Sequence, residues 1–226
     1  MKIFPIGTVS NGSSSGTIDG ISYSMFEPNV TCHSNKVHTI LVTQFENQSL
    51  LTRKKALPFL TITYEYADIF NREYRQIEHF VDDVEDALSS FFVVDFSKGL
   101  TPSSITLSSG DWVVAIDNTR LYSSTANQKA NRAFIWDGIN WKEGQIASVS
   151  TNTSITVDID ANNYGALSLA DAQTNGMVYP LYEVYLTQNA LQNFKSTKFI
   201  HADINNSEDG GYMKTGKITF VTKYKV

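Results

Sequence analysis

Residues 79–102 read HFVDDVEDALSSFFVVDFSKGLTP, and they contain a clear helical pattern in a chain that otherwise has the texture of β-strands. Apolar residues recur there with the 3.6-residue period of one helix face, and acidic residues occupy the other face. The apolar set is Phe80, Val81, Val84, Ala87, Leu88, Phe91 and Phe92; the acidic set is Asp82, Asp83, Glu85 and Asp86. The pattern predicts a helix over about residues 72–91, capped by Asn71, whose residues Phe80, Val84, Leu88 and Phe91 pack on a sheet.

Long segments rich in β-branched and aromatic residues surround this helix and predict strands. They cover residues 17–31, 36–46, 57–70 and 91–96 before the middle of the chain, and 177–189, 194–206 and 216–226 after it. Because the helix must cover a sheet face, these segments predict a β-sandwich with one packed α-helix.

The segment between them, residues 101–178, has a different texture. It lacks a long helical period and carries short strands at short spacing, predicted at 111–117, 132–138, 140–150 and 154–160, with a helical turn before residue 177. Four or five short strands in this length are typical of a small closed barrel. We therefore expect a mainly β protein in which residues 1–100 and 179–226 form a discontinuous β-sandwich domain, and residues 101–178 form an inserted, small OB-like β-barrel.

Composition excludes several classes of function. The 226 residues carry a formal charge of −5, so the basic surface typical of nucleic-acid binders is not expected. No apolar run approaches the length needed to cross a bilayer, and the N-terminal residues do not resemble a secretion signal. With Cys32 as its single cysteine, the chain has no internal disulfide.

Candidate chemical motifs are weak. Cys32, His33 and His38 match no common zinc spacing, residues 158–165 lack the glycine and glutamate of an EF-hand, and residues 11–16 lack the lysine of a phosphate loop. The acidic helix face is best explained as a solvated surface, although a hydrolase with two carboxylates in a cleft stays a rival hypothesis. We expect no catalytic residue, no cofactor and no metal.

The aromatic side chains support one sharper hypothesis. Trp112, Trp136 and Trp141 all belong to the expected barrel, where they could stack on a sugar or fill the barrel core. A carbohydrate-binding adhesion module is therefore the alternative function.

Three features resemble one family, the distal tail proteins of long-tailed bacteriophages. Residues 61–95, TITYEYADIFNREYRQIEHFVDDVEDALSSFFVVD, are similar to the family's strand–helix–strand unit. The interruption by a small barrel resembles the organisation of several members, and GKITFVTKYKV at 216–226 resembles the closing strand of tail-tube-like folds.

The resemblance implies a structural virion protein rather than an enzyme. It implies a homo-oligomeric ring, a hexamer, at the distal end of a phage tail, made in the host cytoplasm and then part of the virion. The ring would join the tail tube protein to the central hub protein and to receptor-binding or fibre proteins of the baseplate, with roles in host attachment. Neither sequence-specific nucleic-acid binding nor membrane insertion is expected, and an acidic balance suits a channel that DNA passes through.

Overall fold

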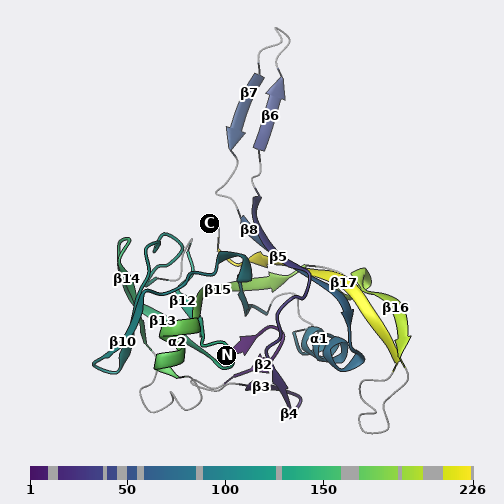
Figure 1. The fold of residues 1–226 in the computed structure, drawn as a ribbon. Coiled ribbons are helices and arrows are strands. Elements are labelled where there is room, and N and C mark those ends of the chain that lie inside the picture. Colours follow the sequence, from purple (N-terminus) through teal and green to yellow (C-terminus); the bar gives the residue numbers. More distant parts are fainter. Residues whose placement is uncertain are drawn as a thin grey trace.

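The structure is a computed structural model that describes residues 1–9, 15–37, 40–44, 50–54, 59–84, 89–125, 129–158, 168–187, 190–200 and 211–224. It is a mainly β protein with one large mixed sheet and two short helices, α1 (Asn71–Asp83) and α2 (Leu169–Asn175) (Figure 1). Neither helix of the described part is long and apolar enough to cross a membrane.

Strand β15 (Met177–Leu186) pairs with three other strands and connects the parts of the sheet. One of its edges pairs with β9 (Phe91–Val94). Its other edge pairs first with β12 (Arg132–Trp136), through residues 177–181, and then with β17 (Gly211–Thr222), through residues 184–186. Two groups of strands therefore leave the same edge of β15 and diverge on either side of it in Figure 1.

The first group contains the strands of residues 101–178. The strands β10 (Ser104–Ser108), β11 (Asp111–Ala115), β14 (Ser154–Asp158), β13 (Trp141–Ser150) and β12 follow one another in the sheet, and β12 continues onto β15. The expected closed barrel is not formed by the described strands, because the free edge of β12 pairs with β15 instead of closing on β10. The division of the chain into two domains at these boundaries stays a prediction.

The second group contains the longest strands. The strand β17 pairs with β8 (Phe59–Ile69) and with β16 (Lys195–Ile200), and β8 pairs in turn with β5 (Thr31–Val37). Two short 3-10 turns, η1 (Phe96–Lys98) and η3 (Ala190–Asn193), follow β9 and precede β16.

The N-terminal strands extend the sheet beyond β9. Strand β1 (Lys2–Ile3) pairs with β9 in parallel and is followed by β2 (Gly7–Thr8), β3 (Ser15–Ile18) and β4 (Ile21–Ser24). The single strand expected over residues 17–31 is wrong, because Asp19 and Gly20, with φ of 51° and 78°, turn the chain between β3 and β4. An Asp-Gly pair with positive φ at both positions is the preferred two-residue hairpin turn.

Helix α1 is shorter than the sequence pattern predicts. It begins at Asn71, which is its first helical residue rather than its cap, and the Glu73 carboxylate accepts the backbone N–H of Phe70 at 2.9 Å. It ends at Asp83, where the Lys2 ammonium donates to the Asp83 carbonyl and pairs with its carboxylate, both at 3.0 Å. A cation is favourable at this negative end of the helix dipole.

The apolar residues predicted for one helix face divide between two elements. Phe80 and Val84 are buried beneath the sheet, and the Phe80 ring lies edge-on to Phe4, 5.1 Å away. Phe91 is buried as well, but it begins strand β9 because β15 takes up the backbone hydrogen bonds of residues 91–94, a tertiary pairing that overrides the local helical period. Leu88 lies outside the described residues.

A two-stranded ribbon connects β5 to β8. Its strands β6 (Ile40–Gln44) and β7 (Leu50–Lys54) pair with each other and with no other described strand. Figure 1 shows this β6–β7 ribbon extending away from the body of the protein. The strand expected over residues 36–46 is thus divided between the end of β5 and β6.

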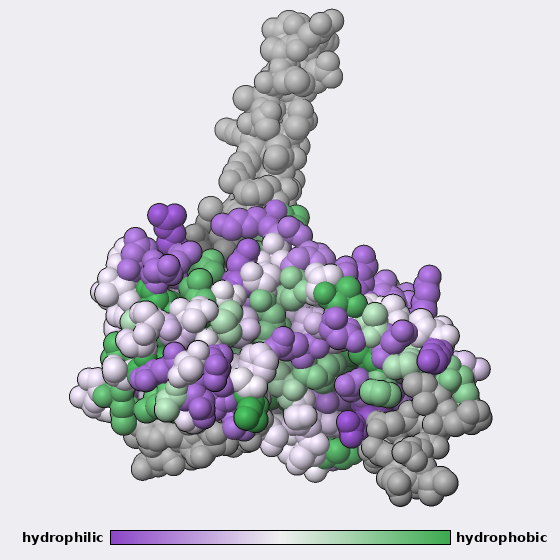
Figure 2. Space-filling model, viewed as in Figure 1, coloured by the Kyte–Doolittle hydropathy of each residue, from purple (hydrophilic) through white to green (hydrophobic). Residues whose placement is uncertain are grey.

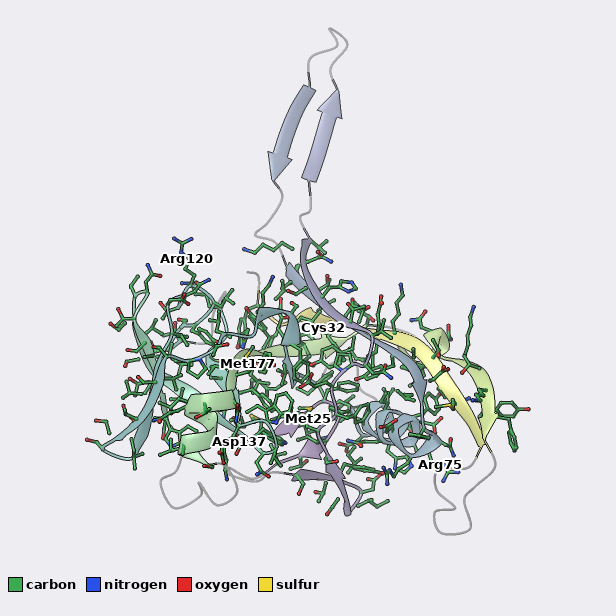
Figure 3. All side chains as sticks on the ribbon, viewed as in Figure 1. Met25, Cys32, Arg75, Arg120, Asp137 and Met177 are labelled. Atoms are coloured by element: carbon green, nitrogen blue, oxygen red, sulfur yellow. The ribbon has the colours of Figure 1, made fainter. Side chains whose placement is uncertain are left out.

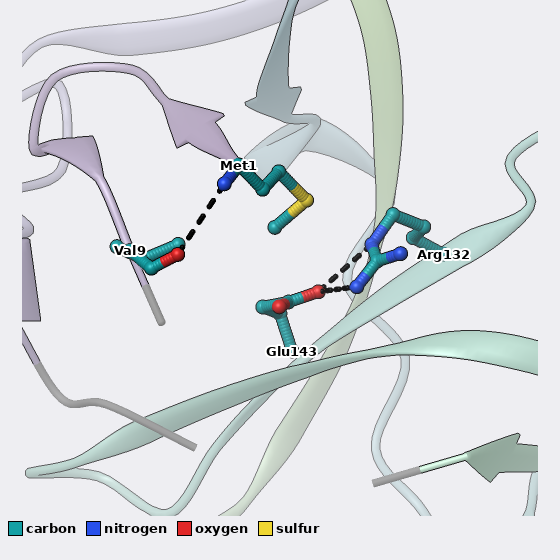
Figure 4. A network of polar contacts seen from close by, with 4 residues as sticks. All are labelled: Met1, Val9, Arg132 and Glu143. Atoms are coloured by element: carbon teal, nitrogen blue, oxygen red, sulfur yellow. Dashed lines mark hydrogen bonds and ion pairs between the residues drawn. The ribbon is translucent and has the colours of Figure 1, made fainter. Parts of the chain in front are cut away.

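A largely buried ion pair links β12 to β13. The Glu143 carboxylate, only 3% exposed, accepts two N–H groups of the Arg132 guanidinium, and the Met1 ammonium donates to the Val9 carbonyl nearby (Figure 4). The guanidinium also lies over the Phe92 ring, 5.7 Å from its centre. The guanidinium thus joins the β12–β13 pair to β9, whereas the Met1 hydrogen bond lies within the N-terminal strands.

Candidate ligand-binding site

The hairpin between β12 and β13 brings two of the three tryptophans together. Trp136 and Trp141 are directly opposite each other, at the last pair of the ladder before the turn. Four residues, 137–140, make the turn, and Gly138 has a φ of +101°, which a residue with a side chain rarely adopts. The turn places Ile139 at its tip with 87% of its surface exposed.

Asp137 closes this turn with its buried carboxylate. One oxygen accepts the backbone N–H groups of Ile139 and Asn140, at 2.9 and 2.6 Å, and the other accepts the N–H of Ser168 at 3.0 Å. Burial by itself disfavours the charged form of Asp137, but the backbone donors outweigh it, so its pKa lies below the usual range. The turn is therefore tied to the residue that caps α2 (Figure 3).

Aromatic rings continue from this hairpin onto β15 and η1. Phe134 stacks on Trp141 with ring centres 5.1 Å apart and planes 21° from parallel, and Tyr179 lies edge-on to Phe96 at 5.2 Å. Beside them is a hollow of about 240 Å³, called here the aromatic hollow. Its lining consists of Met25, Glu27, Phe96, Phe134, Trp136, Ile139 and Trp141.

Glu27 gives this apolar hollow a charged group. The apolar surroundings raise the pKa of its carboxyl above the ordinary value. Burial, and to a smaller extent the Glu27 charge, raise the pKa of Tyr179 to about 12, so this phenol stays protonated. Ring faces with a nearby hydrogen-bond acceptor suit a polyhydroxylated ring, whose C–H face packs on the aromatics while a hydroxyl donates to the carboxylate.

Trp112 does not take part in this site. It lies on β11 and is fully buried in the larger hydrophobic core. The structure therefore assigns Trp112 to the larger core. Trp141 lines the aromatic hollow but is itself buried in the smaller core cluster, and Trp136 lines the hollow with a partly exposed side chain. No local pattern marks Met25 and Glu27 as site residues, because they lie between β4 and β5, far along the chain from the tryptophans.

The weak metal and carboxylate candidates are not assembled into a site by the described residues. No group of three or more His, Cys, Asp and Glu residues in that part of the chain could hold a metal ion. His33 is exposed, and His38 and most of the 158–165 loop lie outside the described residues. Among the lining residues of the aromatic hollow, Glu27 is the single carboxylate, so the lining does not supply the carboxylate pair that glycosidases use.

A larger hollow of about 430 Å³ lies between β4 and α1. Tyr23 and His79 face each other there, with the hydroxyl oxygen 2.8 Å from the imidazole Nδ1, and Arg72 and Arg75 line the same space. Gln76 beneath it donates to the carbonyls of Pro5 and Ser24, at 3.0 and 2.9 Å. These contacts hold α1 to the N-terminal strands.

No protein-family model matches the sequence, and no curated protein matches it either. The resemblance to distal tail proteins thus stays a prediction from the residues quoted for it.

Proposed function

We propose that the protein is a structural component of a long-tailed bacteriophage and assembles into a homo-oligomeric ring, a hexamer, at the distal end of the tail. In this proposal the ring joins the tail tube protein to the central hub protein and to receptor-binding or fibre proteins. It is made in the host cytoplasm and becomes part of the virion. A tail-tube-like β-sandwich around β8, β9, β15 and β17 is part of the same proposal.

The β6–β7 ribbon is the observation that carries the proposal. It extends from the body and pairs with no other described strand (Figure 1). An isolated two-stranded ribbon is marginally stable in water, because independent stability requires a third strand or packing against a helix. Five of its ten residues are aliphatic: Ile40, Leu41, Val42, Leu50 and Leu51. Strand edges that pair with no other described strand, together with aliphatic residues, suit such a ribbon to pack on a neighbouring copy of the chain.

Removal of the ribbon tests the ring, and the register of the sheet supplies the design. Val37 at the end of β5 is directly opposite Phe59 at the start of β8. Replacing residues 38–58 by Asn-Gly therefore closes the β5–β8 pair with a two-residue turn. We expect the full chain to form a hexamer in native mass spectrometry and the shortened chain to be a folded monomer. Ile139→Ser, at an exposed hairpin tip elsewhere, is the matched control and should leave the hexamer intact.

Two results would contradict this proposal. A full chain that is strictly monomeric at tens of micromolar and absent from purified virions would exclude the ring. A shortened chain that still forms hexamers would show that the ribbon does not make the interface, and would move the interface to the strand edges of the body.

The aromatic hollow favours a second candidate function, carbohydrate binding. Trp136 and Trp141 line it together with Glu27. Glycans of the host wall should then quench tryptophan fluorescence of the full chain. Trp136→Ala should abolish the quenching, whereas Trp112→Phe, which alters a buried core residue, should retain it. Equal quenching in both variants would contradict binding at this hollow.

A further inference from the structure

The hollow of about 430 Å³ between β4 and α1 shares no lining residue with the aromatic hollow, and we call it the β4–α1 groove. Its lining includes every residue of β4, from Ile21 to Ser24, and residues of α1 between Arg72 and His79. A strand therefore forms one wall of the groove and a helix forms the other.

The outer edge of β4 faces α1 across this groove. Strand β4 pairs with β3 through a register that begins with Ile18 opposite Ile21, across the Asp-Gly turn. Because the residues that flank a two-residue turn bond to each other, the alternation of the ladder directs the backbone groups of Ser22 and Ser24 away from β3. The Ser24 carbonyl agrees with this direction, since it accepts the Gln76 amide of α1 at 2.9 Å.

This edge of β4 is open to a further strand. It pairs with no other described strand, and the backbone N–H and C=O of Ser22 make no hydrogen bond with any described residue. Proteins usually protect such edges with charged residues or proline, and the four residues of β4, ISYS, include neither. An unprotected strand edge is a template for backbone pairing with another chain.

Gln76 supplies an acceptor from the helix wall. This residue lines the groove and is only 5% exposed, and its Nε2 donates to the carbonyls of Pro5 and Ser24. Because both N–H groups are used in this way, the remaining polar atom of the amide is the acceptor Oε1. Oε1 accepts no hydrogen bond from the described residues, yet it is not sealed from solvent. An open acceptor on an otherwise buried side chain is placed to receive an N–H of a ligand.

Arg75 gives the groove a free positive charge. Its side chain is exposed, and its guanidinium forms no ion pair or hydrogen bond with a described residue. Arg72 lines the groove about one helical turn away, whereas the lining carboxylate of Glu73 already accepts the backbone N–H of Phe70. The groove is thus positive in a chain whose formal charge is −5. This charge complements an acidic side chain, since a guanidinium pairs with a carboxylate through two hydrogen bonds.

We propose that the β4–α1 groove binds an extended, acidic peptide strand of a partner protein. The strand pairs with the backbone of Ser22 at the free edge of β4, as peptides do in other proteins that add a strand to a sheet edge. A further peptide N–H donates to Oε1 of Gln76, and a carboxylate pairs with Arg75. An apolar side chain packs on Ile21, which is 50% exposed. Figure 2 shows hydrophilic and hydrophobic side chains side by side in this region of β4 and α1. This inference does not depend on ring formation or on glycan binding at the aromatic hollow.

Fluorescence polarisation of labelled peptides with the full chain tests the proposal. The probe is the extended peptide STVEVTS with blocked ends, compared at one low ionic strength with STVQVTS and with two forms of STVEVTS, each methylated on one alternate set of backbone nitrogens. We expect the Glu peptide to bind about threefold to fivefold more tightly than the Gln peptide, as for an exposed ion pair. One of the two methylated forms should bind about tenfold more weakly, because its N–H groups cannot donate to the edge of β4. No binding of STVEVTS at millimolar concentration, equal binding of the Glu and Gln peptides, or full affinity of both methylated forms would overturn the proposal.

An arginine pair locates the charge that the peptide meets. Arg75→Gln should lower the affinity for the Glu peptide to that for the Gln peptide and leave the Gln peptide unchanged. Arg120→Gln makes the same change at another exposed arginine, which Figure 3 places at the opposite edge of the body, and it should alter neither affinity. Equal weakening by the two variants would mean binding by general charge attraction and would refute the groove.

A proline in β4 tests the strand edge. Ser22→Pro removes an N–H that points away from β3, so the chain should stay folded and lose the binding of every peptide. A folded Ser22→Pro chain that binds STVEVTS as the parent does would refute pairing at this edge. If Ser22→Pro instead dissociates an oligomer of the parent in native mass spectrometry, the groove holds a second copy of the chain and the proposal is overturned. If the variant does not fold, the methylated peptides and the Arg75 variant still decide.

Discussion

Replacing Phe80 by alanine should destabilise the protein strongly, because this ring joins α1 to the sheet. Phe80 is fully buried, and its ring lies edge-on to Phe4 and Phe91 at centre distances of 5.1 and 5.0 Å. Loss of a buried phenylalanine ring costs about 3–5 kcal/mol, and the loss of two edge-to-face pairs places this case near the upper end. At about 2–4 °C per kcal/mol for a chain of this size, the Tm should fall by about 8–20 °C.

Circular dichroism during heating, together with urea titration, measures the effect. The matched control is Phe70→Ala, which removes the same atoms from the residue just before the same helix, where the side chain is 39% exposed. The control should lose only about 1 kcal/mol, because less apolar surface returns to water. Equal losses in the two variants, or a loss below about 1 kcal/mol for Phe80→Ala, would refute the packing of α1 described above.

Two further substitutions and one labelling experiment test other parts of the structure. Gly20→Ala should cost about 1–2 kcal/mol in urea titration, because Gly20 has a φ of +78° with open space around it, so backbone strain is the only penalty; a variant as stable as the parent would contradict the turn. Asp137→Asn should destabilise the protein at neutral pH, and its difference from the parent should shrink in acid. Because the pKa of Asp137 in the folded protein lies below its ordinary value of 3.8, the carboxylate contributes stability that is fully present at a pH above this ordinary pKa. That stability is lost as the pH falls through the lower pKa of the folded state. A difference in unfolding free energy between variant and parent that is constant from pH 5 to pH 2 would refute the assignment. The Cys32 thiol should react with a maleimide at pH 8 roughly a thousandfold more slowly than a free cysteine, because burial first and the Asp95 charge second raise its pKa to about 12; rapid labelling of the folded protein would contradict its environment.

Local signals in the sequence predicted many of the strands well. The strands expected over 57–70 and 140–150 are observed as β8 (Phe59–Ile69) and β13 (Trp141–Ser150), since both contain β-branched and aromatic residues bounded by turns. The end of α1 was not predictable in the same way. The apolar period continues past Asp83, and only the pairing of residues 91–94 with β15, far along the chain, makes them a strand.

The prediction of a closed barrel is wrong for the same physical reason. Each strand of residues 101–178 carries local information about itself, but nothing in that segment specifies that β12 pairs with residues 177–181 instead of closing the ring of strands. The turn at Asp19 and Gly20 is a different case, because the Asp-Gly pair is itself a local hairpin signal and is sufficient to predict this turn.

The aromatic hollow was partly foreseeable. The sequence WDGIN, residues 136–140, places a tight turn before Trp141, which predicts that Trp136 and Trp141 meet across a hairpin. The burial of Trp112 follows from the alternation of β11, in which Trp112 and Val114 share the buried side. Glu27 could not be predicted as a site residue, since its surroundings come from strands that are distant in the sequence.

The position of β15 has a consequence for how the chain folds during its synthesis. Strand β9 is complete at Val94, and β12 at Trp136, but the strand that pairs with both ends at Leu186. At about 5–20 residues per second, the ribosome adds the intervening residues after Val94 in roughly 5–18 s. During this interval β9 and β12 have exposed edges that other nascent chains can pair with. Chaperone dependence should therefore be greatest for chains arrested before residue 177, and it should fall sharply once β15 has emerged.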